Sequence, residues 1–280
     1  MDDLESTHVA GPQPIAKMIP NLVTMMALIA GIYSLQKAIN GDFEGAVLML
    51  LAAALFDVLD GAIARALKAQ SEFGAQLDSL SDFLAFGIAP AIILYEWTLS
   101  DAGKLCWIAS VVFPVAAALR LARFNVIAKQ PDDIPQWKKR YFMGVPTPAG
   151  AALCLLPIYI WFLSPSSFES LAFATPLVAV WVIIIAALMV SRIPTFSIKY
   201  VKLPPRMMVP MLGFFALIVA ALIHAPWITL SMLSIAYVVS IPMGLRHYRK
   251  QEIQYRDVPE DLTSLAFGIE TPITNECEED

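Results

Sequence analysis

The chain has 280 residues, of which 58% are hydrophobic and 15% are charged. A soluble domain carries about 25% charged residues, so this composition excludes an ordinary water-soluble protein and indicates a membrane protein. The net charge of -5 comes from the C-terminal end, because residues 252–280 hold nine acids and one base, whereas residues 1–251 carry a net charge of +3. The acidic balance therefore describes a tail and not the body of the chain.

The start of the chain is acidic and contains proline, unlike a cleavable signal peptide. A helix crosses a bilayer with about 20 mostly apolar residues. Eight segments fit that length: 19–36, 44–65, 75–98, 105–125, 147–163, 172–190, 207–223 and 226–244. The sequence thus predicts an all-α integral membrane protein of about eight transmembrane helices. We expect a cytosolic tail over 1–18, a transmembrane catalytic domain over 19–245, and an acidic, disordered cytosolic tail over 246–280.

Basic residues test the count of spans. With both termini in the cytosol, 17 of the 19 Lys and Arg residues fall on the inner side, and only Lys37 and Lys104 fall outside. Bases near span ends favour the cytoplasmic side, and a missed span would scramble this sorting. The pattern predicts a multi-pass protein of the inner (cytoplasmic) membrane with eight spans.

Acidic residues interrupt the second and third apolar segments near their predicted cytosolic ends. Asp57 and Asp60 stand three residues apart, and Asp78 and Asp82 stand four apart, so each pair shares a helix face. A charge at the centre of a membrane helix costs about 2.5–3.5 kcal/mol, so such groups face a cavity or a partner. The short connection makes the two helices antiparallel neighbours. We expect the four acids to converge in a pocket that opens to the cytosol.

The residue types in this pocket favour phosphoryl chemistry on metal ions. Clustered carboxylates repel one another, and a divalent cation removes that repulsion. Oxygen ligands suit Mg²⁺ or Mn²⁺ rather than zinc, and two ions that share carboxylates are common in phosphoryl transfer. Gly61 leaves room for a ligand at the backbone, Gly74 is expected to let the two helices pack closely, and the planar fork of Arg65 suits a pyrophosphate. A structural role as buried ion pairs is the alternative.

The spacing of these residues resembles the signature of the CDP-alcohol phosphatidyltransferase family, D-x2-D-G-x2-A-R-x8-G-x3-D-x3-D. The signature is complete over Asp57, Asp60, Gly61, Ala64, Arg65, Gly74, Asp78 and Asp82. The resemblance implies the helical bundle of that family. It also implies that the first three acids, Asp57, Asp60 and Asp78, bind two Mg²⁺ or Mn²⁺ ions. Asp82 is then the general base and also touches the second metal.

The same resemblance implies a binding site for CDP-diacylglycerol, formed by Asn21, Gly61, Arg65, Ser71 and Gly74. Several of these have a simpler interpretation. Ser71 fits a helix cap equally well, and Gly74 fits a packing role better. Asn21 and Thr24 either line the nucleotide side or cap the first span, and the cap is favoured for Thr24.

Other segments resemble the bacterial and archaeal phosphatidylserine synthases of this family: 19–24, 78–82, 86–91, 120–125, 142–149 and 191–199. The resemblance implies L-serine as the acceptor. Candidates for binding serine are polar residues at inner helix ends, preferably an arginine that binds the carboxylate through two hydrogen bonds. They are Arg120, Arg123, Asn125, Arg192 and Lys199. Each base could instead be a topological anchor or a contact to anionic lipid, and Asn125 could instead end its helix.

Taken together, the sequence predicts metal-dependent transfer of a phosphatidyl group from CDP-diacylglycerol to the hydroxyl of L-serine, in phospholipid biosynthesis. The expected partners are these two substrates and membrane lipids, with no nucleic acid. The resemblance also implies a homodimer. One alternative keeps the reaction and changes the acceptor to glycerol phosphate, inositol phosphate or choline. The other is a cation-coupled transporter that uses the acids as a relay, but the two repeated halves with broken helices typical of transporters are not found.

Overall fold

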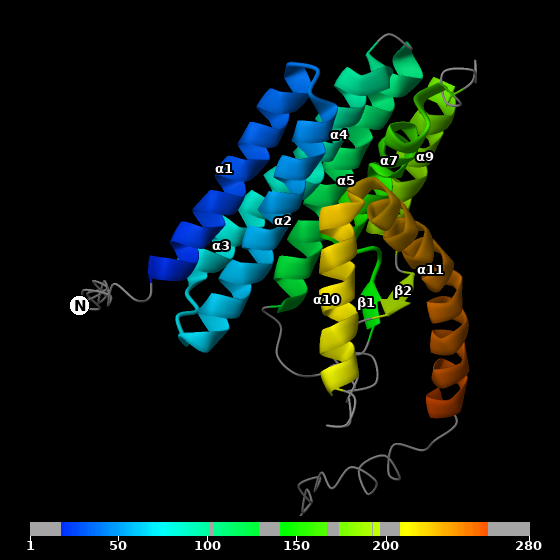
Figure 1. Ribbon diagram of the computed structural model, residues 1–280. Coiled ribbons are helices and arrows are strands. Elements are labelled where there is room, and N and C mark those ends of the chain that lie inside the picture. The colour runs from blue at the N-terminus through cyan, green and yellow to red at the C-terminus, as the bar shows by residue number, and fades with distance from the viewer. Residues whose placement is uncertain are drawn as a thin grey trace, which may run out of the picture.

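A computed structural model describes residues 18–100, 103–128, 141–166, 174–191, 193–196 and 208–256. Within these ranges the protein is a bundle of helices with one small pair of strands (Figure 1). The first hairpin consists of α1 (Ile19–Ile39) and α2 (Phe43–Ala66), which pack along each other. Its turn uses Gly41 at φ 77°, and Asp42 caps α2 by accepting a hydrogen bond from the Gly45 N–H at 2.9 Å. A left-handed glycine and an acidic cap are sufficient to reverse the chain here.

The third apolar segment is one continuous helical run with two widened stretches. It consists of α3 (Glu72–Asp82), the π-helix η2 (Phe83–Ile88), α4 (Ala89–Leu94) and the π-helix η3 (Tyr95–Leu99). Pro90 lies in the first turn of α4 and has no N–H to donate to the preceding turn. The helix therefore widens just before it, in the stretch that directly follows Asp82. Widened turns of this kind are frequent at functional sites, and no pattern in the sequence predicted them.

The next helices form the far side of the bundle. α5 (Lys104–Ala128) packs against η2 and against α9 (Ala174–Val190). Between them, the segment predicted as one span is two short helices, α6 (Thr147–Cys154) and α7 (Leu156–Leu163). Pro157 cannot donate to the Leu153 carbonyl, and the Trp181 indole N–H of α9 donates to that oxygen instead, at 2.8 Å. The break is therefore stabilised by a neighbouring helix.

Two three-residue strands, β1 (Tyr141–Met143) and β2 (Pro194–Phe196), pair antiparallel with Phe142 opposite Thr195. The helices α10 (Met208–His224) and α11 (Pro226–Arg256) follow, and α11 packs on α6, α7 and β2. α11 continues through residues 246–256, which were expected to be disordered. That part of the prediction is wrong, because this stretch contains neither Gly nor Pro and extends the preceding helix. Residues 257–280 lie outside the described ranges.

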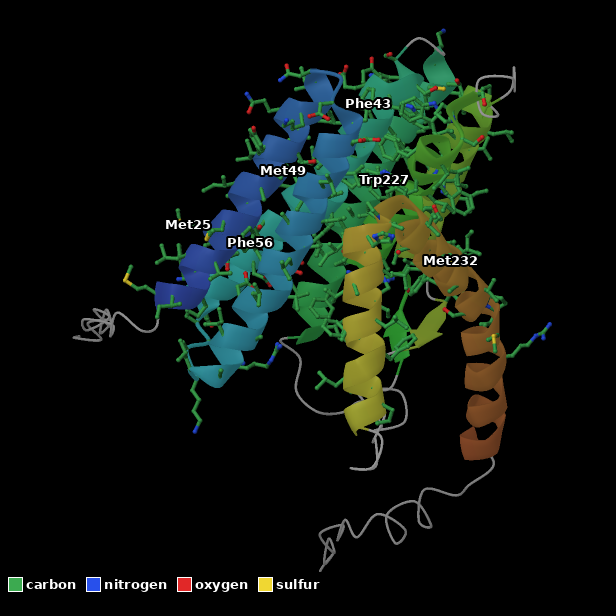
Figure 2. The ribbon with its side chains drawn as sticks, in the orientation of Figure 1. Met25, Phe43, Met49, Phe56, Trp227 and Met232 are labelled. Atoms are coloured by element: carbon green, nitrogen blue, oxygen red, sulfur yellow. The ribbon has the colours of Figure 1, made fainter. Side chains whose placement is uncertain are left out.

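The composition of the helices confirms a helical membrane protein. Five are long and apolar enough to span a bilayer: Ile19–Ile39, Phe43–Ala66, Glu72–Leu99, Lys104–Ile127 and Pro226–Arg246. Three shorter apolar helices cover the other predicted spans, Thr147–Leu163, Thr175–Val190 and Pro210–His224, so the number eight stays a prediction. Large apolar side chains such as Met25 and Met232 point outward from the bundle (Figure 2), as expected for a surface in contact with lipid.

Candidate active site

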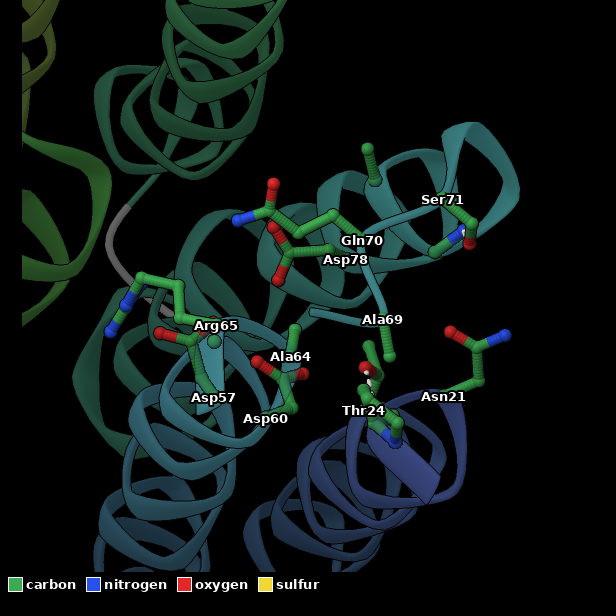
Figure 3. A pocket seen from close by; sticks show the side chains of 14 residues that line it. Asn21, Thr24, Asp57, Asp60, Ala64, Arg65, Ala69, Gln70, Ser71 and Asp78 are labelled. Atoms are coloured by element: carbon green, nitrogen blue, oxygen red, sulfur yellow. Dashed lines mark hydrogen bonds between the residues drawn. The ribbon is translucent and has the colours of Figure 1, made fainter. Parts of the chain in front are cut away.

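The acids of the signature lie where the C-terminal half of α2 faces α3. Asp57 and Asp60 project from α2 toward Asp78 on α3 (Figure 3), and these three residues each offer a carboxylate oxygen within 4.8 Å of the others. Asp82, one turn further along α3, is outside this group of three but interacts electrostatically with Asp57 and Asp78. The structure therefore brings all four acids into one cluster.

The cluster fits a divalent cation. Asp60 is only 5% exposed, and its Oδ2 atom is buried without a hydrogen-bond partner among the described residues. A buried acceptor that is left unsatisfied is costly, and a cation would satisfy it. Carboxylate oxygens alone are the ligand type that Mg²⁺ and Mn²⁺ prefer. The group of Asp57, Asp60 and Asp78 could thus hold a metal ion.

A cavity of about 290 Å³ opens directly beside the acids. Its walls come from the start of α1, the end of α2, the α2–α3 turn and the start of α3. The lining residues are Pro20, Asn21, Thr24, Asp57, Asp60, Gly61, Ala64, Arg65, Ala69, Gln70, Ser71, Gly74, Ala75 and Asp78. Metal-type ligands, an arginine and small residues therefore share one cavity, whereas Asp82 does not line it.

The α2–α3 turn shapes the floor of this cavity. After the end of α2, Lys68 adopts the left-handed conformation at φ 50°, and the Ala69 N–H donates to the Ala64 carbonyl at 2.9 Å, as in a Schellman motif. The Ser71 hydroxyl caps α3 by accepting from the Gly74 N–H at 3.0 Å. Ser71 is thus a helix cap, one of its two predicted roles, and it lines the cavity as well.

Gly74 lets α3 approach α1 and not α2. A Cβ atom at Gly74 would lie 2.8 Å from Asn21 Oδ1 and 3.1 Å from Ser71 Oγ. The prediction that Gly74 lets α2 and α3 pack closely is therefore wrong, because the close contact is with α1. The acids and the cavity lie between α2 and α3, while α1 packs against both of them.

The start of α1 contributes two cavity residues. Asn21 and Thr24 both line it, and the Thr24 hydroxyl donates to the Pro20 carbonyl within the helix at 3.1 Å. The N-cap of α1 is Met18, which makes no side-chain cap. The favoured cap role of Thr24 is therefore wrong, since the helix begins too early in the chain for Thr24 to stand at its end.

Arg65 extends along the wall of the cavity. Its Nη1 atom lies 3.4 Å from where a Cβ at Gly61 would stand, so a side chain at Gly61 would touch the guanidinium. In Figure 3 Arg65 and Asn21 lie on opposite sides of the acids. A ligand that reaches from one to the other would pass over Asp57 and Asp60.

The candidate residues for binding the acceptor differ in the contacts that they make. Arg123 donates to the Val190 and Ser191 carbonyls at 3.1 and 3.2 Å, which ties α5 to the end of α9. Asn125 donates to Ser79 Oγ at 3.0 Å and joins α5 to α3. Both residues therefore have structural roles in the bundle.

Arg120 differs from these two candidates, because it is only 8% exposed and its guanidinium donates to the Thr147 hydroxyl at 2.7 Å instead of to main-chain carbonyls. Lys199 and Arg192 lie outside the described residues.

Two residues near Arg120 were not singled out from the sequence. Thr147 begins α6 and belongs to the segment 142–149, which resembles the family but in which no single residue was assigned a role. Tyr237 lies on α11, where the sequence showed no resemblance to the family. Both come close to Arg120 only through tertiary packing. The one feature of the sequence that could have pointed to Tyr237 is that it places a polar hydroxyl in an apolar span.

Comparisons with known proteins agree with this geometry. The model of the CDP-alcohol phosphatidyltransferase family matches residues 17–190, and a second one, CDP-alcohol phosphatidyltransferase 2, matches residues 206–242. A protein of Mycobacterium leprae named CDP-diacylglycerol–serine O-phosphatidyltransferase is 32% identical over 83% of this chain and 76% of its own length. Proteins of the same name from Helicobacter pylori (30% identical, 72% of this chain and 81% of theirs) and Methanocaldococcus jannaschii (31%, 68% and 77%) are also similar. The chain belongs to the CDP-alcohol phosphatidyltransferase family.

Proposed function

We propose that this protein transfers the phosphatidyl group of CDP-diacylglycerol to the hydroxyl of L-serine, giving phosphatidylserine and CMP. The observation that carries the proposal is the group of Asp57, Asp60 and Asp78 with an unsatisfied, buried carboxylate oxygen in the wall of a cavity that also holds Arg65. The shared name of relatives from mycobacteria, Helicobacter and an archaeon supports serine as the acceptor.

The acids are proposed to hold two divalent ions, Mg²⁺ or Mn²⁺. Asp57, Asp60 and Asp78 would be the main ligands, and Asp82 would reach the second ion from its position beside Asp57. When bound, such ions neutralise the charge of the transferring phosphoryl group.

The chain's own residues would position the two substrates. Arg65 binds the pyrophosphate of CDP-diacylglycerol as a fixed cation, and Gly61 leaves space for the lipid phosphate beside it. Asn21, Ser71 and Gly74 line the same cavity, and the nucleotide would lie beside them.

Asp82 takes the proton from the serine hydroxyl. The serine oxygen then forms a bond to the phosphorus that carries diacylglycerol. The bond from that phosphorus to the bridging oxygen breaks, and CMP leaves with the electron pair.

The cavity is proposed to face the cytosol, in the cytoplasmic membrane, with both termini on that side. Arg65 and Lys68 lie at the α2–α3 turn, at the same lower end of Figure 1 as the two strands, whereas Lys37 and Lys104 belong to the opposite end. Bases gather on the cytoplasmic side, which supports this orientation. A homodimer is proposed from the resemblance to the family, and light scattering of the purified protein in detergent tests it.

An acceptor panel tests the function. Purified protein with CDP-diacylglycerol and Mg²⁺ or Mn²⁺ is given L-serine, glycerol 3-phosphate, inositol phosphate or choline in separate reactions, and CMP is measured. We expect CMP release with L-serine and formation of phosphatidylserine in equal amount. Preference for another alcohol would keep the reaction class and reject serine, and no CMP release with any acceptor would reject the class.

A further inference from the structure

The packing of α5 against the third helical run places a cation beside the reaction centre. Two contacts fix the register of these antiparallel helices: a Cβ at Gly87 would lie 3.0 Å from the Ala117 side chain, and Asn125 bonds Ser79. Arg120 and Asp82 both lie between these two contacts. Electrostatic interaction between Arg120 and Asp82 agrees with that register. The guanidinium therefore lies on the α5 side of Asp82, whereas the cavity of Arg65 lies on the α2 side of α3.

The surroundings of Arg120 come from its own helix and from two further helices. Nη1 donates to Thr147 Oγ1 on α6 at 2.7 Å, and Tyr237 on α11 and Arg123 on α5 lie within electrostatic range. The Nε–H group is buried and has no hydrogen-bond partner among the described residues. Nε belongs to a side edge of the guanidinium, and such an edge binds a carboxylate through two parallel hydrogen bonds. One donor of a carboxylate-binding edge is thus present and unsatisfied.

No carboxylate in the part of the chain that the structure describes forms an ion pair with this cation, and Asp82 acts on it only from beyond ion-pair distance. The ion pair found there joins Lys37 and Asp42 at the other end of the bundle. A charge that is 92% buried and has no carboxylate in direct contact is unfavourable. Arg123 does not share this condition, because the carbonyls at the end of α9 bind its guanidinium. The burial of Arg120 is therefore best explained by an anionic ligand.

We propose that Arg120 binds the carboxylate of the amino-acid acceptor, with Thr147 as the residue that positions its guanidinium. This inference rests on the proposed function. In serine the hydroxyl and the carboxylate are separated by two carbon atoms, so the base and the carboxylate-binding group must lie a few ångströms apart. Asp82 and Arg120 lie at the same level of two adjacent helices, which is the arrangement that this requirement calls for. Acceptors that lack a carboxylate, such as ethanolamine, would leave Arg120 unpaired, and this selects an amino acid.

The test compares Arg120→Gln with Arg246→Gln, which changes an exposed arginine on α11. CMP release is measured at saturating metal while L-serine and CDP-diacylglycerol are varied in turn. Removing one partner of a buried charge pair costs about 2–5 kcal/mol. We therefore expect the KM for L-serine to rise at least about 30-fold in Arg120→Gln, with the KM for CDP-diacylglycerol within about threefold of the wild type. Arg246→Gln should leave both constants unchanged.

Two further arms keep the test decisive if Arg120→Gln does not fold. In the wild type, L-serinamide, which has a neutral amide in place of the carboxylate, should be at least about 30-fold worse than L-serine in kcat/KM. Thr147→Val should raise the KM for L-serine by about 3–10-fold with little change in kcat, and Thr147→Ser should restore it.

The outcomes separate the inference from the function. Equal use of L-serine and L-serinamide, or an unchanged KM for L-serine in a folded Arg120→Gln, would overturn the inference while serine transfer stands. A defect confined to the KM for CDP-diacylglycerol would assign Arg120 to the lipid phosphate instead, and would also overturn it. Absence of serine-dependent CMP release in the wild type would reject the proposed function itself.

Discussion

Gly144 holds the start of α6 against the end of α9, and replacing it by alanine is expected to destabilise the protein strongly. Its φ of 78° is left-handed, which costs an L-residue about 1–2 kcal/mol. A Cβ there would also lie 2.5 Å from the Met189 carbonyl oxygen and 2.9 Å from that of Ser191. Backbone atoms cannot swing aside as side chains do, and overpacking of this kind costs about 1–3 kcal/mol. The sum is about 2–5 kcal/mol.

Thermal unfolding in detergent, followed by the near-ultraviolet circular dichroism of the tryptophans, measures this effect. About 2–4 °C is lost per kcal/mol in a domain of this size, so the Tm of Gly144→Ala should fall by about 4–20 °C. Gly41→Ala has the same backbone conformation with nothing within 4 Å, and Gly213→Ala adds a methyl group in open space on α10. Gly41→Ala should lose about 2–8 °C, and Gly213→Ala should lose nothing. A Gly144→Ala protein as stable as Gly41→Ala would refute the argument from the clash.

Three other predictions concern the reaction and the topology. Asp82→Asn should lower kcat by about 10²–10⁴-fold at saturating metal and lipid, and a variant that keeps more than about a tenth of the wild-type turnover would reject Asp82 as the base. Arg65→Gln should weaken binding of CDP-diacylglycerol, seen as a raised KM for the lipid at nearly normal kcat, whereas a pure loss of kcat would contradict a role in pyrophosphate binding. In a chain with Cys277 changed to Ser, a cysteine at Lys68 should react with an impermeant maleimide only from the cytosolic side, and one at Asn40 only from outside. Labelling of both from one side would exclude the proposed orientation.

The aspartate cluster could be predicted from the sequence because it depends on local geometry. Helical spacing places Asp57 with Asp60 and Asp78 with Asp82, and the short connection between α2 and α3 leaves little freedom in how the two pairs meet. Ser71 as a cap follows from the same local rules.

The errors arose where tertiary packing decides. From the sequence, Gly74 was expected to contact α2, because α2 and α3 are consecutive helices. In the structure α1 packs against both helices, and it is α1 that contacts Gly74. The π-helix after Asp82 and the break between α6 and α7 depend on how neighbours satisfy the carbonyls that prolines leave free, such as that of Leu153. The contact of Thr147 and Tyr237 with Arg120 joins segments far apart in the chain, so no local pattern could indicate it.

The central claim is that the aspartate cluster makes serine phosphatidyl transfer depend on a divalent metal. The most direct measurement is serine-dependent CMP release by the wild type and by Asp78→Asn, each stripped of metal with a chelator and then titrated with Mg²⁺ or Mn²⁺. The account predicts no release from either protein in the chelator, and recovery of the wild type alone on addition of metal, with both proteins shown to be folded by their thermal unfolding. Full CMP release by the wild type in the chelator, or equal recovery of Asp78→Asn at the same metal concentration, would contradict it.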